Sequence, residues 1–378
     1  MEWLKATLQR VTGRQSSTSC AERVLGDGNL CCILLNYAGD KSEARARCVS
    51  KHWARLRRPW VATLPQNGRV QTAAFSPDGA TLVIAGGTTF HGSGQMYDVR
   101  SGALRWEFSC TGEVKSVSFS RDGGTLAVGG HESGQGDRGV PLYDARTGTL
   151  LRQVAGVAFN QYRRNWVAEL AFSRDGATLV VVGHSVVSIY DATTFQLQHD
   201  IEYFSPESVA FSPDCATIAV GGQAGNVVVY DVASGTRVCE HDGNTVIRAL
   251  AFSPSGLLAV GGDDDIFPNN EEDPIIQDLP THKVYKEAGR TLRSVVGGVP
   301  AVYCLAFAPN ESVLVAGGLC GSFAVFDVST LALRSTLWND DVGLAIAFSP
   351  DSSKVAIGGI NHKIRLYETE TGDPVRVP

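Results

Sequence analysis

Long apolar runs are missing from this chain of 378 residues. A helix needs about 20 apolar residues to span a bilayer, and no uninterrupted stretch comes close to that length. The first ten residues, MEWLKATLQR, also lack the apolar centre of a secretory signal peptide. The sequence therefore predicts a protein without a membrane anchor and without a membrane partner.

The cysteines show neither a disulfide framework nor a metal site. There are nine of them, an odd number, and they are scattered along the chain. This usage fits a reducing compartment, so we expect a cytoplasmic or nuclear protein. A group near the N-terminus has no Cys-x-x-Cys pair and no finger-like spacing, and we expect no zinc, other metal or cofactor. That group consists of Cys20, Cys31, Cys32, Cys48 and His52.

What the chain does contain is a repeat of seven related segments. In each, a Phe closes a short apolar run and is followed by a turn and a second apolar run. Successive Phe residues lie 39 to 55 positions apart, a period typical of propeller blades with four short strands. The repeat predicts an all-β, seven-bladed β-propeller over residues 60–378. The seven are Phe75, Phe119, Phe172, Phe211, Phe252, Phe307 and Phe348.

Each repeat has the local chemistry of a blade. Residues 70–75 alternate between two faces, and the turn that follows has Pro77 and Gly79 where type I turns favour them. The second strand is β-branched and ends in paired glycines, and the third ends in an aromatic residue, usually followed by an acid. We expect these aromatic residues to pack between neighbouring blades. They are Tyr97, Tyr143, Tyr190, Tyr230, Phe326 and Tyr367.

This pattern resembles the WD-repeat family of seven-bladed propellers. Two features differ from that family: Tyr stands where Trp usually precedes the Asp, and the Gly-His pair that opens a repeat is missing from nearly all of them. The resemblance implies a buried hydrogen-bonded network made by the replaced residues. We therefore expect apolar packing between blades to supply more of the stability here.

Repeat 7 has almost no sequence left for an outer strand. Only residues 375–377 follow its third strand before the chain stops, whereas residues 60–64 have a strand-like composition and precede the first repeat. We predict that residues 60–64 supply the outer strand of the last blade and join the two ends of the ring. Residues 374–378 are then expected to form a frayed end.

The segment before the propeller differs from it in charge. Residues 1–60 carry 11 Lys and Arg against 5 Asp and Glu, a net of +6, and the propeller carries a net of −12. A propeller of that charge would repel phosphates, so no nucleic acid partner is expected. A basic helical arm that lies on an acidic body would explain the asymmetry.

Residues 23–58, after an N-terminal arm of residues 1–22, read as three short helices and resemble an F-box. The resemblance implies that an apolar face docks on the adaptor subunit of a cullin-RING ubiquitin ligase, with Leu30, Ile33, Leu34, Val49 and Trp53 on that face. The Gly that follows Leu25 departs from the Pro usual in the family. The matching residues are Leu25, Leu30, Ile33, Leu34, Arg45 or Arg47, Val49, Ser50, Lys51, Trp53 and Leu56.

The resemblance implies a substrate receptor: the propeller binds the protein to be modified, and the receptor itself makes or breaks no bond. Proximity to the charged conjugating enzyme then raises the effective concentration of the target lysine. The alternative is a non-catalytic WD-repeat scaffold with no link to a ligase, in which Trp53 is only a packing residue.

Columns across the repeats indicate where a partner binds. The residue four positions before each Phe is expected to line the channel entrance, with Arg69 and Trp166 nearby. His131 and His184 follow the second strands, and Arg163 and Arg164 lie in an insertion, residues 155–166. Partner-binding candidates are therefore Arg69, Lys115, Trp166, Arg248, Tyr303, His131, His184, Arg163 and Arg164. The channel column is Gln71, Lys115, Ala168, Glu207, Arg248, Tyr303 and Leu344.

These cations suggest a site for an acidic or phosphorylated segment, held by charge-assisted Arg contacts. The competing interpretation is that Glu113 and Glu207 neutralise Lys115 and Arg248 within the rim. A second insertion, residues 263–280, is acidic and lacks the spaced ligands of a calcium loop. It is either a segment that selects basic targets or a solvated loop without a function.

An enzyme is the alternative from another class. His131, His184 and Asp263 share a column and are conceivable metal ligands, but they belong to blades 2, 3 and 5. No Gly-x-Ser-x-Gly nucleophile motif is present. The sequence thus predicts no enzymatic activity.

Overall fold

The computed structural model describes residues 61–63, 68–130, 139–154, 167–242, 246–262, 301–319, 321–339 and 342–375, and the strands 282–286 and 290–295. The chain divides between Arg58 and Pro59 into two units, and all described residues belong to the second. The F-box-like segment, with its docking residues Leu30, Ile33, Leu34, Val49 and Trp53, lies outside them. Predictions about that segment stay predictions.

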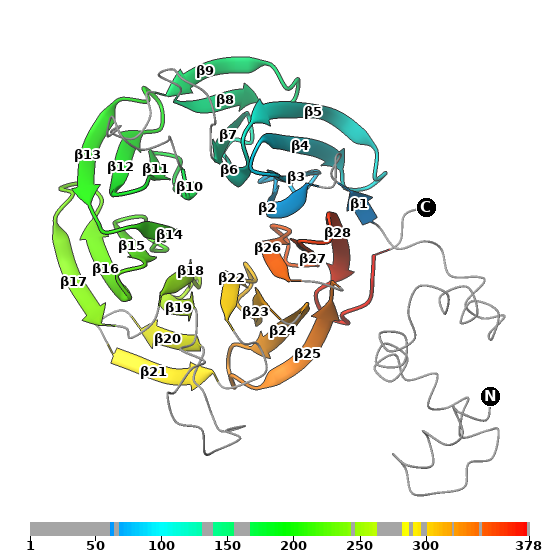
Figure 1. The fold of residues 1–378 in the computed structure, drawn as a ribbon. Coiled ribbons are helices and arrows are strands. Elements are labelled where there is room, and N and C mark those ends of the chain that lie inside the picture. Colours follow the sequence, from blue (N-terminus) through cyan, green and yellow to red (C-terminus); the bar gives the residue numbers. More distant parts are fainter. Residues whose placement is uncertain are drawn as a thin grey trace, which may run out of the picture. The chain divides into compact units, whose positions relative to one another are not determined.

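The described residues form seven four-stranded antiparallel sheets, here called blades and numbered along the chain. Figure 1 shows them arranged in a ring, with one strand of each sheet beside the central axis. Blade 1 consists of β2 (Arg69–Phe75), β3 (Thr81–Gly87), β4 (His91–Asp98) and β5 (Leu104–Thr111). Blade 2 consists of β6 (Val114–Phe119), β7 (Thr125–Gly130), β8 (Val140–Asp144) and β9 (Leu150–Val154).

Blade 3 consists of β10 (Glu169–Phe172), β11 (Thr178–Val182), β12 (Val186–Asp191) and β13 (Leu197–Glu202). Blade 4 consists of β14 (Pro206–Phe211), β15 (Thr217–Gly222), β16 (Asn226–Asp231) and β17 (Arg237–Asp242). Blade 5 consists of β18 (Ile247–Phe252), β19 (Leu257–Gly262), β20 (His282–Lys286) and β21 (Arg290–Val295).

Blade 6 consists of β22 (Val302–Phe307), β23 (Val313–Gly318), β24 (Ser322–Asp327) and β25 (Leu333–Trp338). Blade 7 consists of β26 (Gly343–Phe348), β27 (Lys354–Gly359), β28 (Lys363–Glu368) and β1 (Val61–Thr63). In every blade the strand that ends at the repeat Phe is the innermost strand. The predicted all-β propeller is confirmed.

The core lies between blades. Among the described residues there are seven clusters of buried apolar side chains, and each joins one pair of adjacent blades. The second strands supply more of these side chains than the first, third or outer strands do, because both of their faces are covered, as in β3 and β11, where every residue is buried. The apolar runs of the repeats are therefore the walls of the interfaces between blades.

The aromatic residues that end the third strands lie in these interfaces, as predicted. Tyr190, Tyr230 and Tyr367 are at most 8% exposed, and Phe326 is fully buried. Tyr143 of blade 2 stacks on Phe108 of blade 1, with ring centroids 5.3 Å apart. The aromatic ring thus supplies contact area to the neighbouring blade.

The acids of the repeat stabilise turns at the end of the propeller opposite the channel entrance. Asp98 Oδ1 accepts hydrogen bonds from the backbone N and the hydroxyl of Ser101, both at 2.8 Å. Asp351 Oδ1 accepts one from Ser349 Oγ at 2.6 Å, which, together with the Ser353 backbone amide, lowers the pKa of Asp351 to about 2. Such hydrogen bonds favour the ionised carboxyl and hold each turn closed.

Outer strands also contact the turn of the next blade. Trp106 Nε1 donates to the carbonyl oxygen of Ala145 at 2.9 Å, and the Trp106 ring lies against Gly148. In the next interface Phe195, with φ of 58°, takes the place of that glycine, and the Arg152 guanidinium lies 5.2 Å from the centroid of its ring. A cation-π contact replaces ring packing at this blade pair.

Both ends of the described propeller meet on β28. β1 pairs with it antiparallel, with Val61 opposite Arg365 and Thr63 opposite Lys363, so the role predicted for residues 60–64 is confirmed for residues 61–63. The prediction that the tail frays from residue 374 is wrong for its first two residues. Pro374 forms a bridge with Tyr367, and Val375 N donates to Leu366 O at 2.8 Å, so the tail continues the outer edge beyond β1.

We predict that Ala62→Asp opens this closure. Ala62 is 5% exposed and packs against Ile364, Leu366 and Val70 of the blade 7 to blade 1 interface. A carboxylate buried there without a partner should lower the free energy of unfolding by at least about 2 kcal/mol. Urea unfolding measures the loss. Val61→Asp is the matched control, because Val61 is 40% exposed on the same strand, and equal losses in the two variants would contradict the assignment.

Candidate functional site

The predicted channel column lines one cavity. All seven residues of that column, from Gln71 to Leu344, border a cavity of about 480 Å³ on the propeller axis. Every blade contributes its innermost strand. The placement of Lys115, Arg248 and Tyr303 at the channel, expected from their spacing before the repeat Phe, is thus what the structure shows.

A β-bulge turns these side chains toward the axis. In blade 2, Val114 pairs with Gly130 and Ser116 with Gly129, so Lys115 between them has no partner in the ladder. Blades 1, 4, 5, 6 and 7 show the same register shift at their channel residue. A bulge leaves one residue unpaired and re-aims its side chain, which here places it in the channel.

The paired glycines make room for this bulge. A Cβ atom on Gly130 would overlap the carbonyl oxygen of Glu113, and one on Gly129 would overlap Val167 and Leu170 of blade 3. The first glycine of the pair therefore leaves space for side chains of the next blade, and the second leaves space for the bulged backbone of its own blade.

The two cations of the channel are paired with carboxylates. Lys115 Nζ lies 2.8 Å from Glu113 Oε2, and Arg248 Nη1 lies 2.6 Å from Glu207 Oε2. Gln71 Nε2 donates to the other oxygen of Glu113 at 2.5 Å. These ion pairs favour the competing interpretation of the sequence, neutralisation within the rim. Binding of an acidic ligand by Lys115 and Arg248 stays a prediction.

A third carboxyl group, Glu169, lies deeper and has a different environment. Its Oε2 accepts a hydrogen bond from Val209 N of blade 4 at 2.8 Å, and it is also hydrogen bonded to Ser208. Burial raises the pKa of Glu169 to about 7, while these two hydrogen bonds lower it by less. Glu169 is therefore partly protonated at neutral pH.

Glu169 occupies a position that serines hold in neighbouring blades. Ser116 Oγ accepts from Leu170 N at 3.2 Å, and Ser208 Oγ accepts from Leu250 N at 3.0 Å. Each side chain thus accepts a hydrogen bond from a backbone amide of the next blade. Sequence reasoning missed this role, although Glu169 belongs to the column of residues three positions before each Phe, in which blades 2 and 4 have Ser116 and Ser208.

The lining divides into a polar and an apolar arc. Gln71, Lys115, Glu207 and Arg248 make the polar side, and Gln223 Nε2 donates to Glu207 at 3.2 Å. Blades 6 and 7 contribute Tyr303 and Leu344.

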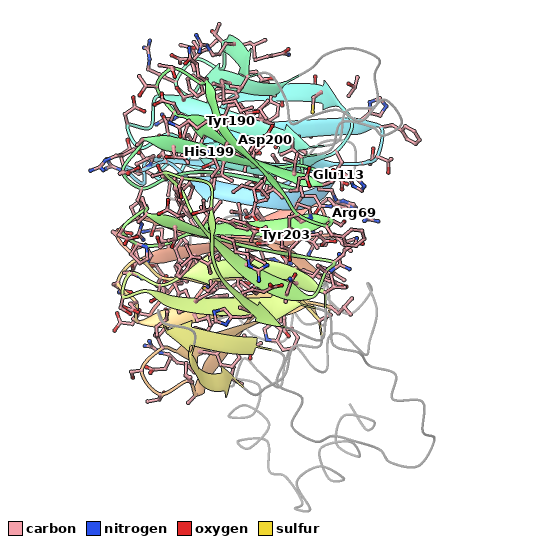
Figure 2. All side chains as sticks on the ribbon, turned by 90° about the vertical axis from the view of Figure 1, so that its left-hand side faces the viewer. Arg69, Glu113, Tyr190, His199, Asp200 and Tyr203 are labelled. Atoms are coloured by element: carbon pink, nitrogen blue, oxygen red, sulfur yellow. The ribbon has the colours of Figure 1, made fainter. Side chains whose placement is uncertain are left out.

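The other candidates are only partly described. Arg69 is exposed at the start of β2 and lies outside the residues that line the cavity, and Figure 2 shows it on the same side of the propeller as Glu113. His184 is half-buried after β11. The remaining candidates and both insertions lie outside the described residues. These candidates are His131, Arg163, Arg164 and Trp166.

Groups of potential metal ligands are absent from the part of the chain that the structure describes. No group of three His, Cys, Asp or Glu side chains there converges as metal ligands. No helix among those residues is long and apolar enough to cross a membrane. What the channel offers is a set of paired charges, amides and apolar side chains, which are groups that bind.

Comparison with known proteins points to one kind of repeat. Residues 289–327 match the family described as WD domain, G-beta repeat. The chain is 25% identical over 227 residues to the Periodic tryptophan protein 2 homolog of Dictyostelium discoideum, which covers 50% of this chain and 24% of that protein. It is 24% identical over 178 residues to WD repeat-containing protein 3 of Mus musculus, which covers 46% and 18%.

A third relative is the Small ribosomal subunit protein RACK1 of Caenorhabditis elegans. It is 27% identical over 176 residues, which covers 44% of this chain and 52% of that protein. This chain thus spans about half or less of the length of each of these three relatives.

We predict that Glu169→Gln stabilises the propeller at alkaline pH. A pKa raised from 4.5 to about 7 means that ionisation costs more in the folded state. Stability is therefore lost as pH rises from about 4.5 through 7. The amide oxygen of Gln can still accept from Val209 N, so the variant should exceed the wild type at pH 8 by about 1 to 3 kcal/mol.

The gap should close near pH 4.5, and urea unfolding at both pH values measures it. The difference between wild type and variant cancels the titration of other groups. Glu370→Gln is the control, because Glu370 is exposed in a turn of blade 7 and should change stability little at either pH. A constant gap, or none at pH 8, would contradict the assigned role of Glu169.

Proposed function

We propose that this all-β WD-repeat propeller is a non-catalytic scaffold that binds a segment of a protein partner over its channel entrance. The channel carries this proposal: each blade directs one side chain into a single cavity, and in six of the seven blades that residue lies in a bulge without a ladder partner. Stability alone gives no reason to place Arg248 and Tyr303 there. The combination of polar and apolar arcs fits a peptide segment with both kinds of side chain.

The relatives support the same function class. Two of them are named for WD repeats or a periodic tryptophan, and one is named as a protein of the small ribosomal subunit. None of these names describes a catalyst. Partners, location and assembly of this chain do not follow from those names, because the matches cover only part of each protein.

We predict that Arg248→Ala with Tyr303→Ala weakens partner binding without unfolding the propeller. The two side chains lie on neighbouring blades at the cavity, and Arg and Tyr are common anchors of interfaces. Proteins captured by the tagged full chain are compared by quantitative mass spectrometry between wild type and variant. A protein specific to the channel should fall at least about tenfold, which corresponds to 1.4 kcal/mol.

The control variant is Arg105→Ala, which removes an exposed cation far from the channel, on an outer strand. It should capture the same proteins as the wild type. Thermal unfolding shows whether each variant is folded. Unchanged capture by a folded Arg248 and Tyr303 variant would rule out the channel as the binding site.

A more specific form of this function is that of substrate receptor of a cullin-RING ubiquitin ligase. The F-box-like residues of segment 23–58 support it, and proximity of target and conjugating enzyme would be the mechanism. A scaffold without this link has the same propeller and differs only in that segment.

Replacing both Ile33 and Leu34 by Glu distinguishes the two. In the receptor, two carboxylates on the apolar docking face should abolish capture of the adaptor subunit, because each would be buried unpaired. Capture of propeller partners should persist. An unmutated chain that recovers no adaptor, or a variant that recovers it fully, would favour the scaffold without a ligase.

A further inference from the structure

A second cavity lies on blade 3, away from the channel, and one of its lining residues, Tyr203, is hydrogen bonded to Asn226 of blade 4. It has a volume of about 550 Å³ and opens where β13 leads into β14. Figure 2 shows this side of the propeller, with Asp200 on β13 and Tyr203 just after its end. The lining residues, here called the rim pocket, are Ser185, Val186, Asp200, Glu202, Tyr203 and Phe204.

Two residues of the rim pocket, Tyr203 and Asp200, are held by hydrogen bonds. Tyr203 is 7% exposed, and its hydroxyl donates toward the backbone oxygen of Asn226 at 2.6 Å and lies 2.8 Å from Asn226 Oδ1. Ser188 Oγ donates to Asp200 Oδ1 at 2.5 Å. A partner would therefore meet a preformed surface, and little side-chain order would be lost on binding.

Phe204 stands out from that surface. It is 72% exposed, the largest exposed fraction among the large apolar residues described. The next residue, Ser205, has φ of 47°, a left-handed conformation that turns the chain back into β14. Folding thus gains little from Phe204, whereas a partner could bury it.

The charge of the rim pocket has one sign. Asp200 and Glu202 contribute two exposed carboxylates, and no Lys or Arg lines the cavity. Behind its wall Asn226 also contacts Glu240, whose charge adds to burial and Tyr230 in raising the pKa of Tyr203. In the channel, by contrast, the carboxylates Glu113 and Glu207 already have the cations Lys115 and Arg248 as partners.

We propose that the rim pocket binds a basic side chain, Arg or Lys, of a protein partner. The cation would lie between Asp200 and Glu202, and its aliphatic stem or guanidinium plane would cover the Phe204 ring. The proposal rests on the proposed function and makes it more specific: the partner segment that reaches the channel entrance carries a basic residue at the edge of blades 3 and 4.

The test uses the full chain and two fluorescent blocked hexapeptides, Gly-Leu-Arg-Leu-Arg-Gly and Gly-Leu-Glu-Leu-Glu-Gly. Fluorescence anisotropy at low salt measures their binding. The basic peptide should bind at least tenfold more tightly than the acidic one. Asp200→Asn with Glu202→Gln should weaken the basic peptide about tenfold, and Phe204→Ala should weaken it severalfold.

The matched control is Glu370→Gln with Asp373→Asn, which removes two exposed carboxylates from the turn after β28 of blade 7, a different blade from that of the rim pocket. It has the same net charge as the rim variant and should bind like the wild type. If both double variants bound the basic peptide equally weakly, the loss would come from net charge alone, and the proposed site would be wrong. Preference for the acidic peptide, or binding that ignores the Asp200 and Glu202 substitutions, would overturn it too.

Failure here is separable from failure of the proposed function. If a captured partner is lost with Arg248→Ala and Tyr303→Ala but retained by the rim variant, the channel function stands and the rim proposal falls. If the rim variant loses the partner and the channel variant keeps it, the rim pocket is the binding site and the channel is not. Thermal unfolding of every variant excludes loss of fold as the cause.

Discussion

Apolar packing between neighbouring blades is the interaction on which this propeller depends. A single four-stranded sheet would expose both faces of strands such as β3 and β11, whose residues are all buried in the ring. Each blade therefore needs a neighbour on both sides, and only a closed ring supplies that for every blade. Closure in turn needs one sheet that holds both ends of the propeller, which is why β1 and residues 374–375 lie along the same edge of β28.

The same constraint frees the innermost strand for function. Since the second and third strands fill the interfaces, the first strand tolerates a bulge that removes one residue from the ladder. That residue gives up a pairing and gains access to the axis. The backbone position is therefore repeated from blade to blade while its side chain varies: it is Gln71 in blade 1, Lys115 in blade 2 and Leu344 in blade 7. Fold and binding surface can thus change independently.

Periodicity made much of this predictable from the sequence. Spacing relative to the repeat Phe was enough to place Lys115, Arg248 and Tyr303 at the channel, because a repeat fixes the position of each residue in its blade. Spacing could not show that Glu113 and Glu207 bind those cations, since that depends on side-chain conformations across blades. Spacing also could not reveal the role of Glu169, which takes the place of serine and is understood only from its contact with Val209. Nor could it reveal the exposure of Phe204, which precedes the left-handed residue Ser205.

Among the described residues of the propeller, some carboxylates already have hydrogen-bond or ion-pair partners and others do not. This difference has consequences that the total charge of the propeller does not reveal. The propeller sequence carries a net of −12, from which a general attraction for basic molecules would follow anywhere on its surface. Many of its aspartates, however, are held by their own turns, as Asp351 is by Ser349, and the channel carboxylates Glu113 and Glu207 are held by cations. A carboxylate already bound by the protein gains less from a ligand cation. Asp200 is held in the same way by Ser188 Oγ, so the distinguishing feature of the edge between β13 and β14 is the exposed Phe204 ring beside the exposed carboxylates of Asp200 and Glu202.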